Sequence, residues 1–292
     1  MNNKIKFVVF GSSRFSVIVL DELEKAGYIP DCVVTIPDKP KGRKLILTPS
    51  LVKDWAIQRK IQVYGPAKLD DEFTKSLSEE KWDLFIVASY GKIIPSAIIN
   101  MPKYKTLNIH PSLLPKYRGA SPLQSAMLDD AKQTGVTIIR IDEEMDHGPI
   151  VARENVNVNE WPIYEEFEAM MAKIGGRLLE KIIPLWIAGK IKEKEQNHKQ
   201  ATYTRKITKE DGLISLNYDP YLNFRKIQAF HEWPLVYFLI NHRGKEIRVK
   251  ITQALFSNGK LNIEKVIPEG GGEMLYEDFL HGYRKPVTPI DE

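Results

Sequence analysis

Three polar residues in the middle of the chain could together catalyse acyl transfer. Asn108 and His110 lie two residues apart in the apolar run 106–110, so they share one face if that run is a strand. Asp146 follows in the acidic, glycine-containing segment 142–149. An amide and a protonated imidazole can hold a developing oxyanion. The histidine can also manage the proton of an attacking amine, and a carboxylate can keep the histidine charged or order a water. These residue types predict transfer of an acyl group to an amine, although a hydrogen-bonded strand end and a solvated loop acid would explain them about equally well.

Apolar runs along the first half of the chain must form the strands that position these side chains. Such runs lie at 5–10, 32–36, 84–88, 106–110 and 136–141, and helical patterns lie at 15–25, after Thr48-Pro49, at 122–129 and at 163–188. Nearly continuous apolar strands separated by helices favour a mostly parallel sheet that is buried on both faces. We therefore expect a doubly wound α/β domain of Rossmann-like type. Ligands of such a sheet bind beyond the carboxyl ends of its strands, so the loops after 106–110 and 136–141 are expected to meet there.

The character of the chain changes after residue 188. Residues 189–205 are polar and charged, which predicts an exposed linker. Beyond it, one helical stretch at 221–229 is followed by strand patterns at 236–240, 246–253 and 261–267, with His-Arg-Gly and Ser-Asn-Gly turns between them. This pattern predicts a small antiparallel barrel, an OB-like barrel being one option. We expect a catalytic domain at 1–188 and a barrel domain at 206–292.

The composition excludes several classes of protein. The 292 residues include 42 Lys or Arg and 38 Asp or Glu, and the resulting net charge of +4 is too small to indicate nucleic acid by itself. No apolar run approaches the ~18 residues that a membrane-spanning helix needs. The single cysteine, Cys32, excludes an internal disulfide and a cysteine-based zinc site. The first residues also lack the pattern of a signal peptide, so a cytoplasmic location is expected.

Other kinds of active site are poorly supported by the sequence. Residues 11–16 lack the second and third glycines of a dinucleotide-binding fingerprint, and no P-loop motif occurs. A metal hydrolase built on His110, Asp146 and His147 would lack an HExxH motif, so no metal site is expected. A nucleophile at Ser112 would lack the Gly-x-Ser-x-Gly context of a nucleophile elbow.

Two long segments resemble a known family of enzymes. LNIHPSLLPKYRGASPLQ (107–124) and TGVTIIRIDEEMDHGPIVA (134–152) closely resemble the folate-dependent formyltransferases, and the likeness continues through 201–203 and 206–211. The resemblance therefore covers nearly the whole chain. The chain departs from the family at Arg14, where an acid is usual, and at His147, where a small residue is usual.

This resemblance implies a reaction and the residues that carry it out. Asn108, His110 and Asp146 would be the catalytic residues of a direct transfer without a covalent enzyme intermediate. The formyl donor would be 10-formyltetrahydrofolate, used without a metal. The residues implied to contact the folate are Ser112, Leu113, Leu114, Pro115 and Tyr90. Within the family the chain looks most like the members that formylate the methionyl amine of initiator tRNA, so initiator methionyl-tRNA is the implied partner.

Positive charge in two regions favours tRNA as the acceptor. The segment 37–44 carries four cations against one acid and matches the family's tRNA-inserting loop. The linker 189–205 has a net charge of +3 and residues 206–268 have +4, whereas 269–292 has −4. The candidate tRNA contacts are Lys39, Lys41 and Arg43 in the first region, and Lys206, Arg225, Lys226, Arg243 and Lys245 in the second.

Two alternative functions are consistent with parts of the sequence. The three candidate catalytic residues are shared by relatives that formylate amino-sugar nucleotides, so they do not determine the acceptor. A non-catalytic RNA-binding module is a non-enzyme alternative, and the joint presence of Asn108, His110 and Asp146 argues against it. We expect a monomer without an obligate protein partner.

Overall fold

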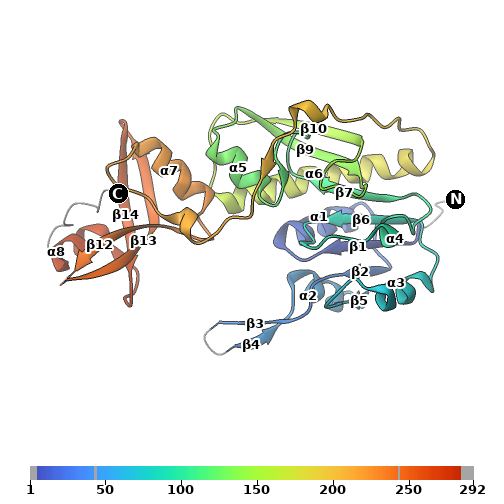
Figure 1. Ribbon diagram of the computed structural model, residues 1–292, viewed down its shortest axis with the longest axis horizontal. Coiled ribbons are helices and arrows are strands. Elements are labelled where there is room, and N and C mark those ends of the chain that lie inside the picture. Colours follow the sequence, from blue (N-terminus) through green and yellow to red (C-terminus); the bar gives the residue numbers. More distant parts are fainter. Residues whose placement is uncertain (1–4, 43–44, 243, 284–292) are drawn as a thin grey trace. The chain divides into compact units, whose positions relative to one another are not determined.

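The chain folds into two compact units (Figure 1). A computed structural model describes residues 5–42, 45–242 and 244–283. Unit 1 contains the residues up to Pro122 together with 133–157 and 168–204, and unit 2 contains 123–132, 158–167 and the residues from Arg205 onward.

Unit 1 is built on a seven-stranded sheet. In spatial order the strands are β10 (Ile150–Asn157), β9 (Gln133–Arg140), β7 (Thr106–His110), β6 (Leu84–Ala88), β1 (Phe7–Gly11), β2 (Cys32–Val34) and β5 (Gln62–Tyr64). The five strands from β7 to β5 are parallel, whereas β9 and β10 are antiparallel to their neighbours. The expected mostly parallel α/β class is confirmed, but the run 136–141 lies in an antiparallel strand.

Helices cover both faces of this sheet because its central strands are apolar throughout. Every residue of β1 and β6 is buried. The helices with residues in unit 1 are α1 (Arg14–Lys25), α2 (Leu51–Gln58), α3 (Asp71–Ser78), α4 (Ser96–Ile99) and, from Glu168 onward, α6 (Tyr164–Ile187). Phe73 of α3 and Ile98 of α4 share a core cluster with Val8 and Phe10. The α1 and α6 helices are joined by an ion pair between Glu22 and Arg177.

The N-cap of the second helix lies two residues after the residue that was expected to be the N-cap. The side chain of Ser50 accepts a hydrogen bond from the Lys53 amide, so Ser50 is the N-cap of α2. Thr48 cannot take this role because it pairs with Lys39 in a hairpin. The Thr48-Pro49 start of the helix was therefore wrong, and a serine competing with a threonine two positions away explains the error.

A two-stranded hairpin occupies most of the segment expected to be a basic loop. It consists of β3 (Lys39–Lys41) and β4 (Ile46–Thr48), which are antiparallel. The side chains of Leu45, Ile46 and Leu47 are 70%, 63% and 67% exposed.

The charged segment expected to be a linker is integrated into unit 1. Residues 189–204 belong to that unit, and Lys194 forms a bridge with Ile150 at the start of β10. A short strand, β11 (Tyr203–Thr204), pairs in parallel with β8 (Arg118–Gly119), and a 3-10 turn, η1 (His198–Gln200), precedes it. The polar composition of this segment concealed the pairing because backbone groups, rather than apolar side chains, make these contacts.

Unit 2 contains a four-stranded antiparallel sheet. Its elements are the 3-10 turn η2 (Glu210–Gly212), α7 (Pro220–Ala229), β12 (Val236–His242), β13 (Lys245–Ser257), β14 (Lys260–Pro268), β15 (Met274–Leu275) and α8 (Tyr276–Gly282). The α5 helix (Pro122–Leu128) also belongs to this unit, except for its first residue. The first turn of α6 belongs to it as well. Phe238 of β12 packs against Phe279 of α8, and both are buried. The antiparallel sheet agrees with the expectation, whereas closure into an OB-like barrel stays a prediction.

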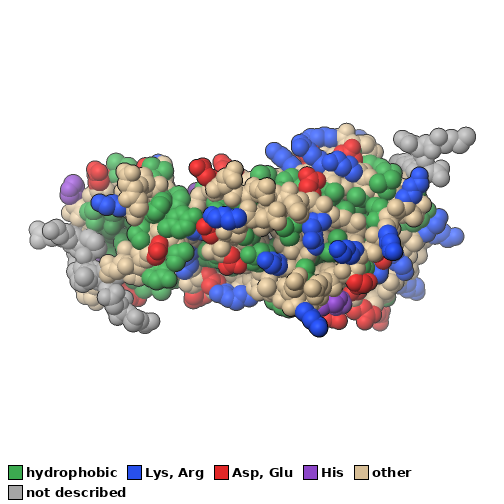
Figure 2. Space-filling view, turned by 90° about the horizontal axis from the view of Figure 1, so that it is seen from above, with side chains coloured by type: hydrophobic (Ala, Val, Ile, Leu, Met, Phe, Trp, Pro, Cys, Tyr) green, Lys and Arg blue, Asp and Glu red, His purple; other side chains and the backbone are tan. Residues whose placement is uncertain are grey.

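Charged side chains of both signs are exposed on one face of the molecule, among apolar ones. Figure 2 shows Lys and Arg side chains (blue) interspersed with Asp and Glu side chains (red) over the face that it draws. Within the described residues, no helix has the length and apolar content needed to cross a bilayer.

Candidate active site

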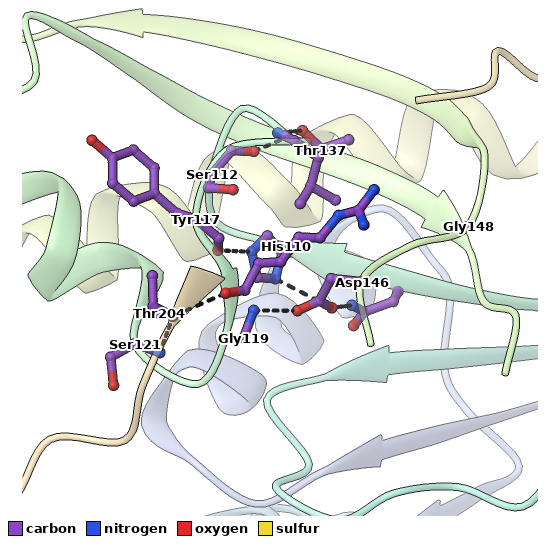
Figure 3. A network of polar contacts seen from close by, with 12 residues as sticks. His110, Ser112, Tyr117, Gly119, Ser121, Thr137, Asp146, Gly148 and Thr204 are labelled. Carbon is purple, nitrogen blue, oxygen red and sulfur yellow. Dashed lines mark hydrogen bonds and ion pairs between the residues drawn. The ribbon is translucent and has the colours of Figure 1, made fainter. Parts of the chain in front are cut away.

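The structure brings Asn108, His110 and Asp146 together beside the carboxyl end of β7. The Asn108 amide nitrogen lies 3.3 Å from Asp146 Oδ1, and His110 Nδ1 lies 3.6 Å from the same oxygen. The two β7 residues point to one face of the strand, as their spacing predicts. Figure 3 shows the His110 ring and the Asp146 carboxylate facing each other.

Asp146 reaches this point by a route that the sequence did not indicate. Because β9 is antiparallel to β7, its last residue, Arg140, pairs with Leu107 rather than with the end of β7. The segment 141–149 must therefore turn back to bring Asp146 to His110. The expectation that both loops leave the same end of the sheet was wrong, since it assumed that β9 is parallel.

The two nitrogens of His110 have different partners. Nε2 lies 2.8 Å from the Tyr117 carbonyl oxygen, which can only accept a hydrogen bond, so Nε2 carries a hydrogen. In the neutral imidazole the Nδ1 lone pair is then directed toward Asp146. The His110 side chain is 6% exposed and that of Asp146 13%, which limits the screening of their interaction by water.

The Asp146 carboxylate is fixed by a backbone amide as well as by side chains. Gly119 N donates to Asp146 Oδ2 at 2.7 Å, so the two carboxylate oxygens have different partners. Gly119 has φ +108°, and a Cβ at this position would lie 2.4 Å from the Thr204 carbonyl oxygen. Only glycine fits here, because both the backbone angle and the approach of β11 exclude a side chain.

The loop that follows His110 is held by hydrogen bonds within unit 1. The Ser112 hydroxyl donates to the Lys116 carbonyl at 2.6 Å, and the Thr137 hydroxyl donates to the Ser112 carbonyl at 2.7 Å. The Leu114 amide donates to the Thr137 hydroxyl at 3.2 Å, and Arg153 donates to the Leu114 carbonyl. Ser112 and Leu114, both expected to contact folate, are fully buried and shape the loop.

The remaining folate candidates of this loop lie nearer to its surface. Leu113 and Pro115 are partly buried, and Leu113 packs closely over Gly135 of β9. The Leu114–Pro115 peptide bond is cis, and the Pro115 carbonyl accepts a hydrogen bond from Thr202 N. Backbone groups of the loop are therefore already engaged, which leaves the apolar side chains for contact with a ligand.

Tyr90 lies in the core rather than at a surface. Its ring packs edge-on against Phe10, and its hydroxyl oxygen is buried without a hydrogen bond to any described residue. Burial raises the pKa of the Tyr90 hydroxyl to about 12, so it stays protonated.

Two exposed apolar side chains, Met145 next to Asp146 and Ile93 in the segment before α4, were not identified from the sequence. Ile93 is 85% exposed and Met145 60%, and their loops are linked by a hydrogen bond from the Ser96 hydroxyl to Glu143. Exposed apolar side chains of this size favour a flat apolar ligand. Ile93 follows Gly91 and Lys92, and Met145 lies in an acidic segment, so neither residue had a clear signal in the sequence.

Further residues support the site from the segment that was expected to be a linker. Arg118 is 1% exposed and donates to Gln196, which in turn donates to the Asp146 carbonyl. His147 stacks on His198 and bonds Asp142, so it is part of this support. Gln196 and His198 carry no motif, whereas Arg118 and His147 lie within the two segments that resemble a family.

The candidate tRNA contacts are placed on both units, and two of them lie outside the described residues. Lys39, on the hairpin of unit 1, and Lys206, in unit 2, are exposed, whereas Arg43 and Arg243 fall outside the part of the chain that the structure describes. Lys41 ends β3, and the single acid of the basic segment, Asp38, pairs with Lys53 of α2.

One further candidate, Arg225, is not available for tRNA. Its side chain is 2% exposed and forms an ion pair with Asp130 within unit 2. The Arg225 guanidinium also lies over the rings of Trp161 and Tyr221. The prediction of a tRNA contact at Arg225 was wrong, since burial against aromatic rings had no signal in the sequence.

The arrangement suits proton transfer beside a polarised carbonyl group. It joins a nitrogen of the His110 imidazole, an amide donor and a carboxylate in a place partly shielded from water. Among the residues that the structure describes, no three His, Cys, Asp or Glu side chains converge to form a metal site. These residue types in this geometry are compatible with acyl transfer to an amine.

Comparison with known proteins identifies the family. The family described as formyl transferase matches residues 3–183, which is more than half of the chain. The chain belongs to the formyl transferase family.

Individual relatives extend this similarity beyond the matched domain. The chain is 37% identical over 254 residues to the methionyl-tRNA formyltransferase of Buchnera aphidicola subsp. Schizaphis graminum, which covers 86% of this chain and 79% of that protein. It is 34% identical over 301 residues to the methionyl-tRNA formyltransferase of Sulfurihydrogenibium sp., covering 98% and 96%. The second match includes nearly all of unit 2.

A solved structure shares the fold at lower sequence identity. The N-formyltransferase of Helicobacter canadensis, in complex with folinic acid and dTDP-3-aminofucose, superposes with a TM-score of 0.63 at 22% identity. The match covers 87% of this chain and 88% of that protein.

Proposed function

We propose that this enzyme transfers the formyl group of 10-formyltetrahydrofolate to the α-amino group of methionyl initiator tRNA, in the cytoplasm. The convergence of Asn108 and His110 on Asp146 carries this proposal. The names of relatives that are 34% and 37% identical over most of the chain support the choice of acceptor.

In the proposed mechanism the methionyl amine attacks the formyl carbon directly. A new carbon–nitrogen bond forms, the bond between the formyl carbon and the folate nitrogen breaks, and the surplus proton of the amine passes to His110 Nδ1. Asn108 donates a hydrogen bond to the oxyanion that develops on the formyl group. Asp146 supports the positive charge of the protonated His110 imidazole and orders a relay water, through which the proton reaches the departing folate nitrogen.

The loops around Asp146 fit the flat ring system of a folate. Met145 exposes apolar surface next to Asp146, and Ile93 exposes apolar surface before α4. Leu113 and Pro115 are the accessible members of the predicted folate segment. Folate supplies the activated formyl group, and these side chains would hold its rings so that the formyl carbon faces His110. Ser112, Leu114 and Tyr90 would act by shaping the surrounding loops.

The basic hairpin and unit 2 would bind the tRNA. Lys39 and Lys41 lie on the hairpin, and Arg43 falls within the same segment. Lys206 and Arg243 would contact the phosphate backbone from the C-terminal domain, which we propose to be an OB-like barrel spanning 206–292. We propose that the enzyme acts as a monomer on initiator methionyl-tRNA.

Replacing His110 tests the proposed chemistry. Because His110 Nδ1 is the proposed proton acceptor, we expect His110→Ala to lower the rate of labelled formyl transfer by about 10²–10⁴-fold. Binding of initiator methionyl-tRNA, measured by filter retention, should stay within twofold of the wild type. Wild-type activity in His110→Ala would refute the mechanism, and binding without any activity in the wild type would favour an RNA-binding module.

A second candidate acceptor is an amino-sugar nucleotide. The dTDP-3-aminofucose in the complex of the Helicobacter canadensis protein favours it, because that protein shares the fold. Competition for limiting labelled donor among initiator methionyl-tRNA, elongator methionyl-tRNA and a dTDP-amino sugar decides between them. We expect label on the initiator tRNA, and preference for the sugar would overturn the proposed acceptor.

A further inference from the structure

Arg118 organises two side chains that lie behind Asp146. Its guanidinium is buried, and a buried cation needs acceptors for its hydrogens. Nε and Nη2 donate to Gln196 Oε1 at 3.3 and 2.7 Å, and Nη2 also donates to His198 Nδ1 at 2.9 Å. One guanidinium therefore fixes two residues of the segment 189–204.

These two residues hold three consecutive residues of the Asp146 loop. Gln196 Nε2 donates to the carbonyl oxygens of Asp146 at 2.9 Å and of Gly148 at 2.7 Å. The His198 ring stacks on His147 at a centroid distance of 4.0 Å and an interplanar angle of 9°. The carbonyl groups of Asp146 and Gly148 and the side chain of His147 are thus held from the same segment.

The Asp146 loop needs such external support. Asp146 has φ +51°, a left-handed conformation that costs free energy in a residue other than glycine. The segment 141–149 also lacks helix and strand, so no regular backbone hydrogen bonds impose this conformation. A Cβ at Gly148 would lie 1.9 Å from the Arg140 carbonyl oxygen, which shows how closely the loop is pressed onto β9.

We propose that Arg118, Gln196 and His198 are positioning residues for Asp146. Arg118 orients Gln196 and His198, and these hold the loop so that the Asp146 carboxylate stays against Asn108 and His110. The inference rests on the proposed function for its effect on the reaction, whereas the placement of the carboxylate can be tested without substrate. It makes the segment 196–198 part of the active site.

The variant Gln196→Glu keeps the contact of residue 196 with Arg118 but removes its contacts with the Asp146 loop. A carboxylate at this position still accepts from Arg118 and stays ionised beside it, but it cannot donate to the carbonyls of Asp146 and Gly148. Because small displacements of a reacting group are costly, we expect kcat to fall about 10²-fold with KM for both substrates within about twofold.

The matched control is Glu193→Gln, in the same segment, whose carboxylate pairs with Arg140 and does not contact Asp146. Its kcat should equal that of the wild type.

A measurement without substrate distinguishes positioning from other effects. In protein labelled at histidine, the imidazole NMR signal of His110, assigned by its loss in His110→Gln, reports the neighbouring carboxylate. We expect this signal to shift in Gln196→Glu and to stay in place in Glu193→Gln. If the wild type fails to formylate methionyl initiator tRNA, the proposed function is wrong, while the shift still supports the positioning.

Variants of His198 keep the test open if Gln196→Glu does not fold. His198 is exposed, so its replacement should leave the fold intact. We expect His198→Ala to move the His110 signal and lower kcat about tenfold, and His198→Phe, which can still stack on His147, to restore part of the rate. An unmoved His110 signal and a kcat within threefold of wild type in all folded variants would overturn the proposal.

Discussion

His110 has one nitrogen tied to the backbone and one directed toward Asp146, and this difference determines its chemistry. The Tyr117 carbonyl fixes the hydrogen on Nε2, so a substrate proton can only be accepted at Nδ1. Once protonated, Nδ1 donates toward the carboxylate 3.6 Å away. The same nitrogen can therefore take a proton and later return it, and Asp146 compensates the charge in between.

The charge of Asp146 is expected to matter more than its shape. Asparagine tolerates the left-handed backbone at this position and retains an oxygen that accepts from Gly119 N, but it carries no charge. We expect Asp146→Asn to lower kcat by about 10²-fold with little change in melting temperature. Steady-state kinetics and thermal unfolding check this, and a kcat within threefold of the wild type would contradict it.

Gly119 tests the backbone side of the same carboxylate. In Gly119→Ala the new methyl group would collide with the Thr204 carbonyl and displace the amide that holds Asp146 Oδ2. We expect a loss of about 1–3 kcal/mol in the free energy of unfolding, together with a lower kcat. Gly189→Ala is the matched control: Gly189 has φ +65° and open space around it, so this variant should lose stability but keep its kcat. Equal kcat values in the two variants would argue against a role of Gly119 in the site.

At the scale of elements, the sequence predicted the strands and helices that apolar periodicity determines. It missed the strand directions and pairings that depend on distant segments. The buried runs of β1 and β6 and the capped helix α1 follow from their own residues. The direction of β9 depends on the path of the preceding segment, which the pattern of 136–141 cannot reveal. The hairpin of β3 and β4 and the pairing of β11 with β8 likewise depend on partners distant in the sequence.

The functional residues also divide into those that the sequence identified and those that it missed or misassigned. Asn108 and His110 could be paired by their spacing in one strand, and Asp146 was proposed from its acidic, glycine-containing segment and supported by resemblance to a family. Gln196 was missed because its role consists of hydrogen bonds to backbone carbonyls, which any polar residue in a charged segment could make. Arg225 was misassigned because sequence does not distinguish an exposed from a buried arginine.

The turn η2 of unit 2 is expected to depend on the charge of Asp211. The Arg205 guanidinium, which donates to this carboxylate, holds the pKa of Asp211 well below its usual range, and hydrogen bonds from Thr208 act in the same direction. A lowered folded-state pKa stabilises the fold at pH values above the unfolded pKa of about 3.9, and this contribution is lost as the pH falls through the folded-state value.

This linkage predicts that the wild type and Asp211→Asn differ in free energy of unfolding by an amount that depends on pH. At pH 7, Asp211→Asn should lower the free energy of unfolding of the full chain by about 1 kcal/mol, a small value because Arg205 is largely exposed and water screens the pair. Below pH 4 the difference should shrink. Urea unfolding at several pH values measures it, and a difference that is constant from pH 7 to pH 3 would contradict the assignment.

At the scale of the whole molecule, the net charge of +4 conceals an uneven distribution. Residues 206–268 carry a net +4, and the acidic residues after 268 partly mask it. Asp38, just before the hairpin, is paired with Lys53 of α2. Burial lowers the pKa of the Lys92 amine, and the charge of Lys39 on the hairpin lowers it further. Positive charge is therefore concentrated where the proposed tRNA contacts lie.

This distribution predicts a steep dependence of tRNA affinity on salt. Each phosphate contact contributes roughly 0.7–0.9 to the slope of log K against log salt concentration. We expect the double variant Lys39→Ala, Lys41→Ala to reduce the slope by about 1 for each phosphate that is no longer neutralised. Binding isotherms between low and physiological ionic strength measure this. A flat dependence in the wild type would contradict tRNA as the acceptor.

The burial of Cys32 makes the protein well suited to site-specific labelling. This residue, the single cysteine of the chain, is fully buried in β2, and burial raises the pKa of its thiol to about 12. A maleimide reagent reacts with thiolate, so the natural thiol should stay unmodified in the folded protein. A cysteine introduced on the exposed hairpin, for example Leu47→Cys, would then carry a fluorophore alone and report the arrival of tRNA at that element without removal of a native residue from the core.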